Sequence, residues 1–189
     1  MSRIVQTAQA IAPTAAETIA YRIDGDDVIV WVNDAWERFA DTNGWARGDA
    51  VLGRSLWESI AGAETSLLWR ELVTRARRGV AINVPFRCDA PDARRYLELS
   101  LTPGGSGALE FCSTTTAIEE RDPIALMAAH YEPGEPLRCC SWCKRFDTDG
   151  WVEVEEAVAR LGLLEHESRA VTHAMCAECE SRVRNSAGL

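Results

Sequence analysis

Four of the seven cysteines in this 189-residue chain form two Cys-x-x-Cys pairs near its C-terminus. Cys140 pairs with Cys143, and Cys176 pairs with Cys179. A pair at this spacing can present two thiolates to one ion from a tight turn, and two pairs complete the tetrahedron that zinc prefers. The sequence therefore predicts one structural zinc ion per chain, held by these four residues.

Two residues beside the pairs are alternative ligands. His173 lies three positions before the second pair, and Cys139 directly precedes the first. The segment between the two cysteine pairs has a regular pattern. Its apolar residues recur at helical spacing over 154–161, and Gly162 can end that helix. We therefore expect an ordered element between two metal-binding turns.

Other roles for the cysteines explain less of the pattern. Two structural disulfides do not suit a cytoplasmic protein, and a redox Cys-x-x-Cys needs only one pair. An iron–sulfur cluster stays open as an alternative. So does a thiol redox switch that uses Cys139 beside Cys140.

The chain carries no recognisable catalytic constellation. It contains no Gly-x-Ser-x-Gly, no phosphate-binding loop, no His-Glu-x-x-His and no dinucleotide glycine fingerprint. The three histidines all follow residue 129, outside the larger predicted domain. A zinc ion held by four thiolates also has no open position for a substrate. We expect a protein that is not an enzyme.

Composition and charge narrow the partners and the location. The formal net charge is −9 and the sequence pI is about 4.9, so the chain on average repels a phosphate backbone. This argues against nucleic acid, although a zinc-dependent transcription regulator stays open as an alternative. The apolar runs are far shorter than the roughly 20 residues of a membrane span, and the N-terminus lacks the apolar core of a secretory signal. We expect a cytoplasmic protein with no membrane partner.

The elements that precede the cysteines indicate an α+β domain. A turn of composition Asp-Gly-Asp-Asp separates two β-branched runs, which predicts a hairpin, and Asn33 or Asp34 can cap a helix after it. Short helical pieces and a longer helix, starting at Thr65 or Ser66 and ending near Gly79, come next. Alternating apolar residues then predict three antiparallel strands, at 82–88, 97–101 and 109–111.

This order of elements resembles a PAS domain over about residues 18 to 116. The residues that carry the likeness are the runs Tyr21-Arg22-Ile23-Asp24, Val32-Asn33-Asp34-Ala35-Trp36 and Val51-Leu52-Gly53-Arg54-Ser55-Leu56-Trp57. The resemblance implies an antiparallel sheet with flanking helices and a ligand pocket between the sheet and the longer helix. The expected pocket residues are Leu68, Trp69, Leu72, Val84, Phe86, Leu99 and Phe111. Plain core stays open as an alternative for all of them, because an apolar helix stripe that packs on a sheet needs no ligand.

A second resemblance covers about residues 138 to 183. The runs Arg138-Cys139-Cys140-Ser141-Trp142-Cys143-Lys144 and Thr172-His173-Ala174-Met175-Cys176-Ala177-Glu178-Cys179 look like the zinc-binding tail of some bacterial sensory PAS proteins and response regulators. Thr172 and Ala174 replace that tail's usual Ser and Gly, and neither is a ligand. The expected layout is a flexible arm (1–17), a PAS-like domain (18–116), a linker (117–137), a small zinc-stabilised helical module (138–183) and a tail (184–189).

Together the two resemblances imply a bacterial signalling protein. The PAS-like domain would sense an unknown small molecule or mediate homodimerisation. The zinc module would then contact a signalling partner protein.

Overall fold

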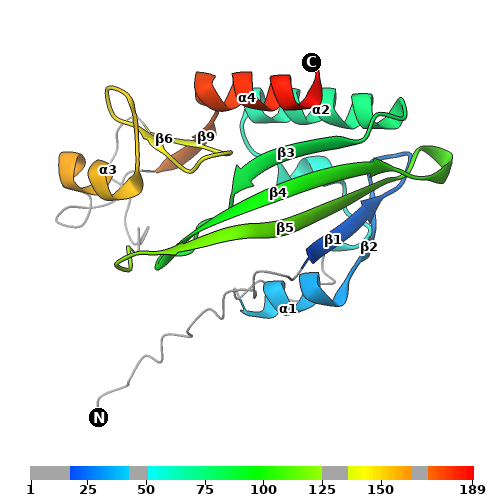
Figure 1. The fold of residues 1–189 in the computed structure, drawn as a ribbon, viewed down its shortest axis with the longest axis horizontal. Helices are drawn as coiled ribbons and strands as arrows, with labels where there is room; N and C mark the ends of the chain where they lie inside the picture. The colour runs from blue at the N-terminus through cyan, green and yellow to red at the C-terminus, as the bar shows by residue number, and fades with distance from the viewer. Residues whose placement is uncertain (1–17, 43–50, 125–135, 163–169) are drawn as a thin grey trace, which may run out of the picture.

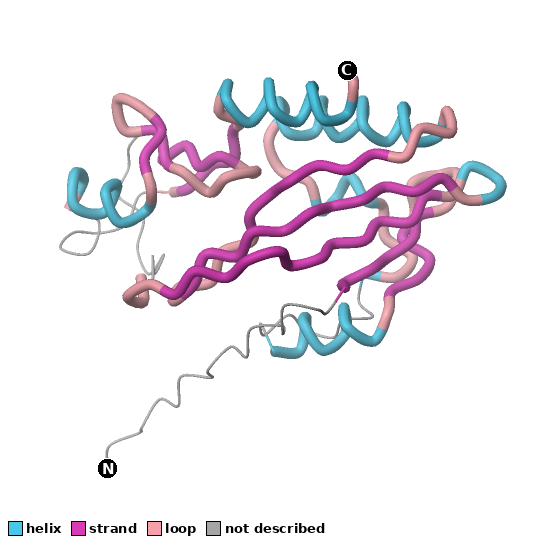
Figure 2. The backbone as a smooth tube through the Cα atoms, viewed as in Figure 1, coloured by secondary structure: helices cyan, strands magenta, loops and turns pink. Residues whose placement is uncertain are grey.

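A five-stranded antiparallel sheet forms the centre of the fold in the computed structural model, which describes residues 18–42, 51–124, 136–162 and 170–189. Its strand order is β2-β1-β5-β4-β3, and every neighbouring pair is antiparallel (Figures 1 and 2). The strands are β1 (Thr18–Ile23), β2 (Ile29–Val32), β3 (Ile82–Arg87), β4 (Ala93–Pro103) and β5 (Leu109–Glu120).

Local polar groups form the predicted hairpin and the helix that follows it. The Asp24 carboxylate accepts hydrogen bonds from the amides of Asp26 and Val28, which closes the turn between β1 and β2. The Asn33 side chain accepts a hydrogen bond from the amide of Trp36, so Asn33 caps α1 (Asp34–Thr42). The Asn33 side chain also accepts a hydrogen bond from the Ala20 amide and donates one to the Thr18 carbonyl, which holds the start of α1 beside β1.

Helix α2 (Ala63–Arg77) packs an apolar stripe onto the inner face of the sheet. Leu68, Leu72 and Ala76 are each at most 2% exposed. The helix begins two residues before the predicted start at Thr65 and ends at Arg77, two residues before the predicted stop at Gly79, which adopts the positive φ of 90° that favours glycine. A short 3-10 helix, η2 (Leu56–Ser59), precedes it, and η3 (Gly105–Gly107) lies in the turn between β4 and β5.

The cysteine-bearing part has a second sheet in addition to its helices, which the expectation of a small helical module did not include. Its four strands follow the order β8-β7-β6-β9. They are β6 (Leu137–Cys140), β7 (Phe146–Asp147), β8 (Trp151–Val152) and β9 (Val171–Ala174), accompanied by α3 (Val154–Leu161) and α4 (Ala177–Ala187). The strands were missed because two of them have only two residues and the other two only four, too few for a period of two to show clearly in the sequence.

Several predicted boundaries move in the structure. Strand β5 continues to Glu120, past the expected domain end at 116, because residues 117–120 pair with β4 in one long hairpin. Residues 184–187, expected as tail, belong to α4, whose apolar face extends to Ala187. The expected arm at 1–17 and most of the expected linker, residues 125–135, lie outside the described residues.

The hydrophobic core of the larger sheet extends to α4 and to the residues around the four cysteines. Buried residues of the larger sheet and α2 form a continuous cluster with Trp142, Met175, Val183 and Ala187. Helix α4 contacts β3 and lies beside α2, where Arg184 forms an ion pair with Glu71 at 2.6 Å (Figure 1). A smaller cluster under α3 contains Leu137, Phe146 and Ala157 among others. No helix within the described ranges is long and apolar enough to cross a bilayer.

Candidate metal centre

The first cysteine pair lies in a tight turn at the end of β6. Cys140 is the last residue of that strand, and its amide donates to the Arg145 carbonyl at 2.8 Å. The Lys144 amide returns a hydrogen bond to the Cys140 carbonyl at 3.0 Å. Lys144 itself has a left-handed φ of 61°, which turns the chain sharply enough to bring Cys143 back beside Cys140. We call residues 140–145 the cysteine turn.

The second pair lies where β9 leads into α4. Strand β9 runs parallel to β6 with Cys140 opposite Ala174, so both pairs leave the small sheet at the same end. Cys176 is the N-cap of α4 and accepts a hydrogen bond at 3.4 Å from the amide of Cys179, in the first turn. The partial positive charge at a helix N-terminus stabilises thiolates at this position.

The four sulfur atoms have the spacing of a tetrahedral metal site. All four lie within 4.8 Å of one another, and the Sγ atoms of Cys140 and Cys143 lie 3.7 and 3.8 Å from that of Cys176. A tetrahedron with zinc–sulfur distances of about 2.3 Å has edges of about 3.8 Å. The separations exclude disulfides, which need about 2.05 Å. The residues present therefore fit a four-coordinate ion.

The site is closed and its charge is compensated by donors. The four cysteines are at most 6% exposed. The Cys176 amide donates to the Cys140 sulfur at 3.5 Å, and the Arg182 guanidinium donates to the Cys179 sulfur at 3.3 Å. Such donors stabilise ionised sulfur in a buried site.

Hydrogen bonds among the thiols set their ionisation. Hydrogen bonds from the thiols of Cys143 and then Cys179 hold the pKa of Cys140 far below its ordinary value. The same hydrogen bond to Cys140 raises the pKa of Cys143 to about 12, and the pKa of Cys179 is also raised, first by its hydrogen bond to Cys140. One thiolate thus suppresses ionisation of its neighbours, whereas a divalent cation stabilises several thiolates together.

The two alternative ligands lie apart from this group. Cys139 and His173 face each other across the β6–β9 pair. Cys139 points into the smaller core cluster, where burial raises its pKa to about 11, and His173 is exposed. Neither belongs to the four-cysteine group, because neighbouring strand residues alternate between the two faces of a sheet.

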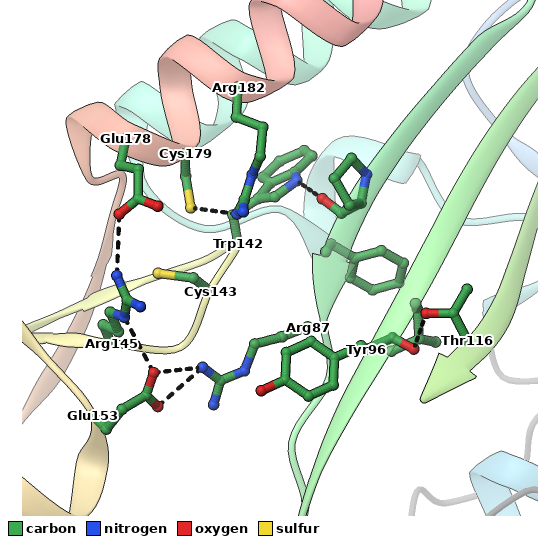
Figure 3. Close-up of a pocket in the computed structure, with 13 residues that line it drawn as sticks. Arg87, Tyr96, Thr116, Trp142, Cys143, Arg145, Glu153, Glu178, Cys179 and Arg182 are labelled. Carbon is green, nitrogen blue, oxygen red and sulfur yellow. Dashed lines mark hydrogen bonds and ion pairs between the residues drawn. The ribbon is translucent and has the colours of Figure 1, made fainter. Parts of the chain in front are cut away.

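A chain of ion pairs joins the cysteine turn to the edge of the larger sheet (Figure 3). Buried Arg87 on β3 donates to both Glu153 oxygens, at 2.9 and 3.0 Å. Glu153 also accepts from Arg145, which bonds in turn to Glu178 at 3.1 Å. The Trp142 indole nitrogen donates to the Pro85 carbonyl at 2.7 Å. These contacts surround a cavity of about 320 Å³, on which Cys143 and Cys179 border.

The residues expected to line a ligand pocket divide into two groups. Leu68, Leu72, Val84 and Phe111 are at most 2% exposed and form packed core. Trp69, Phe86 and Leu99 line a second cavity, of about 280 Å³. The other lining residues, which the sequence did not single out as pocket residues, are Tyr21, Trp36, Ser113, Ser141, Trp142 and Lys144. Trp142, between the first two cysteines, was the one sequence signal that this turn contributes to the cavity. A large aromatic side chain in a tight turn is stable only when it packs against another part of the fold.

A comparison with protein-family models found no matching family, and a comparison with curated proteins found no relative.

Proposed function

We propose that this chain is a cytoplasmic, non-catalytic sensory protein of bacterial type. In this proposal a PAS-like domain binds a small molecule or forms a homodimer, and a zinc-held C-terminal module contacts a signalling partner protein. The observation that carries the proposal is the shared core, in which the four-cysteine centre packs directly on the larger sheet. A change in the sheet domain therefore has a short physical route to the module.

The arrangement of the larger domain supports its sensory half. Its order is a hairpin, short helices, one longer helix and three antiparallel strands, the same order on which the resemblance to PAS domains rests. The cavity lined by Trp69, Phe86 and Leu99 lies on the inner face of the sheet. An apolar cavity of about 280 Å³ is close in size to the smaller ligand pockets of proteins.

Zinc is proposed as the ion of the cysteine centre, with a structural role. Four thiolates at tetrahedral spacing suit zinc and leave no position for a substrate. Its ligands come from the end of β6 and the start of α4, so the ion holds two segments that are far apart in the sequence. The module has only a small apolar cluster of its own, so a bound zinc ion would supply a large part of the free energy that keeps the module folded.

Elemental analysis of the purified chain tests the zinc assignment. We expect one mole of zinc per mole of chain, released by a strong chelator and recovered on reconstitution. A substoichiometric metal content that does not rise on reconstitution would show that the four cysteines do not hold zinc.

Native mass spectrometry of the full, zinc-loaded chain tests the sensory assignment. We expect either a small molecule that co-purifies with the chain or a homodimer at micromolar concentration. A chain that is monomeric and carries no small molecule would contradict the sensory role while leaving the zinc assignment intact.

A further inference from the structure

The cavity on the inner face of the larger sheet is walled partly by the cysteine turn. Ser141, Trp142 and Lys144 line it from one side, and all three lie within one residue of a metal-site cysteine. The other walls come from the sheet and from Trp36 of α1 and Trp69 of α2. The metal centre and the cavity are thus built from the same short loop.

The lining favours a flat aromatic ligand. Five of its nine residues are aromatic: Tyr21, Trp36, Trp69, Phe86 and Trp142. Their rings already contact one another in edge-on and tilted arrangements, with centroids 5.4 Å apart both for Tyr21 with Trp36 and for Trp69 with Trp142. An aromatic ligand can replace solvent against these ring faces and add further ring contacts of the same kind.

The charge of the lining favours an anion on that ligand. Lys144 is the one charged side chain among the described residues that line the cavity. Its ammonium donates to the Ser141 carbonyl at 2.7 Å, and an ammonium has three donors. A carboxylate on the ligand would gain a charge-assisted hydrogen bond from Lys144, whereas a cationic ligand would be repelled.

The cysteine turn is fastened to the elements that form the other walls. The Ser141 hydroxyl lies 3.0 Å from that of Thr65 on α2. The Trp142 indole donates to Pro85, and the Trp142 carbonyl accepts from the amide of Arg87 at 2.8 Å. A metal ion at Cys140 and Cys143 would therefore restrain the same loop whose side chains complete the cavity.

We propose that this cavity binds a flat aromatic carboxylate, and that this ligand and the metal at the four cysteines strengthen each other's binding. The inference rests on the proposed sensory function and names its ligand class and its coupling. Linkage is reciprocal, so the factor by which zinc tightens the ligand equals the factor by which the ligand tightens zinc. We expect a factor of about ten, within the usual range of such couplings.

Binding of 2-naphthoate to the full, zinc-loaded chain tests the ligand class. Calorimetry should show one saturable site, and the Lys144→Gln variant should weaken binding about tenfold, as expected for the loss of one charge-assisted hydrogen bond. Lys144→Arg should restore most of the affinity. The neutral isostere 2-naphthamide should bind the wild-type chain and Lys144→Gln equally. Absence of saturable naphthoate binding, or equal naphthoate affinity in Lys144→Gln, would overturn the proposal.

Competition with a chromogenic chelator tests the coupling. Saturating 2-naphthoate should raise the zinc affinity of the full chain about tenfold. The Trp36→Ala variant provides a matched control, because Trp36 belongs to the cavity wall but lies on α1, which carries no metal-site cysteine. It should keep the ligand-free zinc affinity and lose the naphthoate effect. Naphthoate that binds without changing the zinc affinity would refute the coupling.

These outcomes separate this inference from the proposed function. A different small molecule found by native mass spectrometry, together with no naphthoate binding, would refute the ligand class and support the sensory role. A chain with neither ligand nor dimer would remove the sensory role itself.

Discussion

Shortening one buried side chain on α4 should destabilise the whole molecule. Val183 is fully buried and belongs to the cluster that also contains Ile82 and Val84 of β3. Val183→Ala removes two methyl groups, which costs about 1.6 kcal/mol in transfer free energy. The cavity left behind adds about 1 kcal/mol. The free energy of unfolding should therefore fall by about 2–3 kcal/mol.

Thermal unfolding with zinc in fixed excess measures this effect. For a chain of this size the melting temperature should fall by about 5–10 °C. Tryptophan fluorescence and far-UV circular dichroism should report one coincident transition, since the strands and α4 share a core. Ser181→Ala is the control: Ser181 is exposed on the same helix, and its replacement should change stability by less than about 0.5 kcal/mol.

Two separate transitions, with only one shifted by Val183→Ala, would refute the reasoning. They would mean that the cysteine module unfolds independently of the larger sheet, so the shared cluster would contribute no cooperativity. The division of the chain into two domains at residues 117–137 would then describe its stability better than one core does.

Three further perturbations test individual contacts. Elemental analysis should find stoichiometric zinc in Cys139→Ser but not in Cys140→Ser. Equal zinc contents in the two variants would contradict the placement of Cys140, and not Cys139, among the metal ligands. Arg87→Met should lower the free energy of unfolding in urea by about 2 kcal/mol, because the buried Asp89 carboxylate loses both hydrogen bonds from Arg87 and, among the described residues, keeps only its ion pair with Arg121 at 3.6 Å. A loss under about 1 kcal/mol would contradict this. Burial opposes ionisation of Glu155, but its own amide and Arg94 hold its pKa below the ordinary 4.5. The ionised Glu155 carboxylate therefore stabilises the fold at pH values above about 4.5, and this stabilisation is lost as the pH falls through the lowered pKa. When the free energy of unfolding is measured against pH, Glu155→Gln should make its decrease at acid pH shallower.

The sequence indicated the larger sheet well because its signals are local. Alternation in β3, β4 and β5 marks residues that face the core, and the capping side chain of Asn33 bonds within its own turn. The small sheet gave no such signal. Its strands are short and are held by pairing with partners far along the chain, such as β6 with β9.

The predicted pocket shows the same limit at the level of single residues. Leu68 and Trp69 are neighbours in α2 and were both expected to line a pocket, but consecutive helical residues point about 100° apart. Leu68 is packed core, and Trp69 borders the cavity. The helical period identifies the apolar stripe of a helix, but it does not show which residues of that stripe pack against a sheet and which border a cavity. That depends on the angle at which the helix crosses the sheet.

The spacing of the cysteines by itself determined that Cys140 lies close to Cys143 and Cys176 close to Cys179, since each pair closes within one turn of backbone, and that the two pairs together could hold one metal ion. Only the tertiary structure decided where that centre lies. The apolar face of α4 could pack on any apolar surface, and the pattern of its residues names no partner. In the fold it covers β3, so the turn that holds the first cysteine pair also forms a wall of the cavity on the sheet.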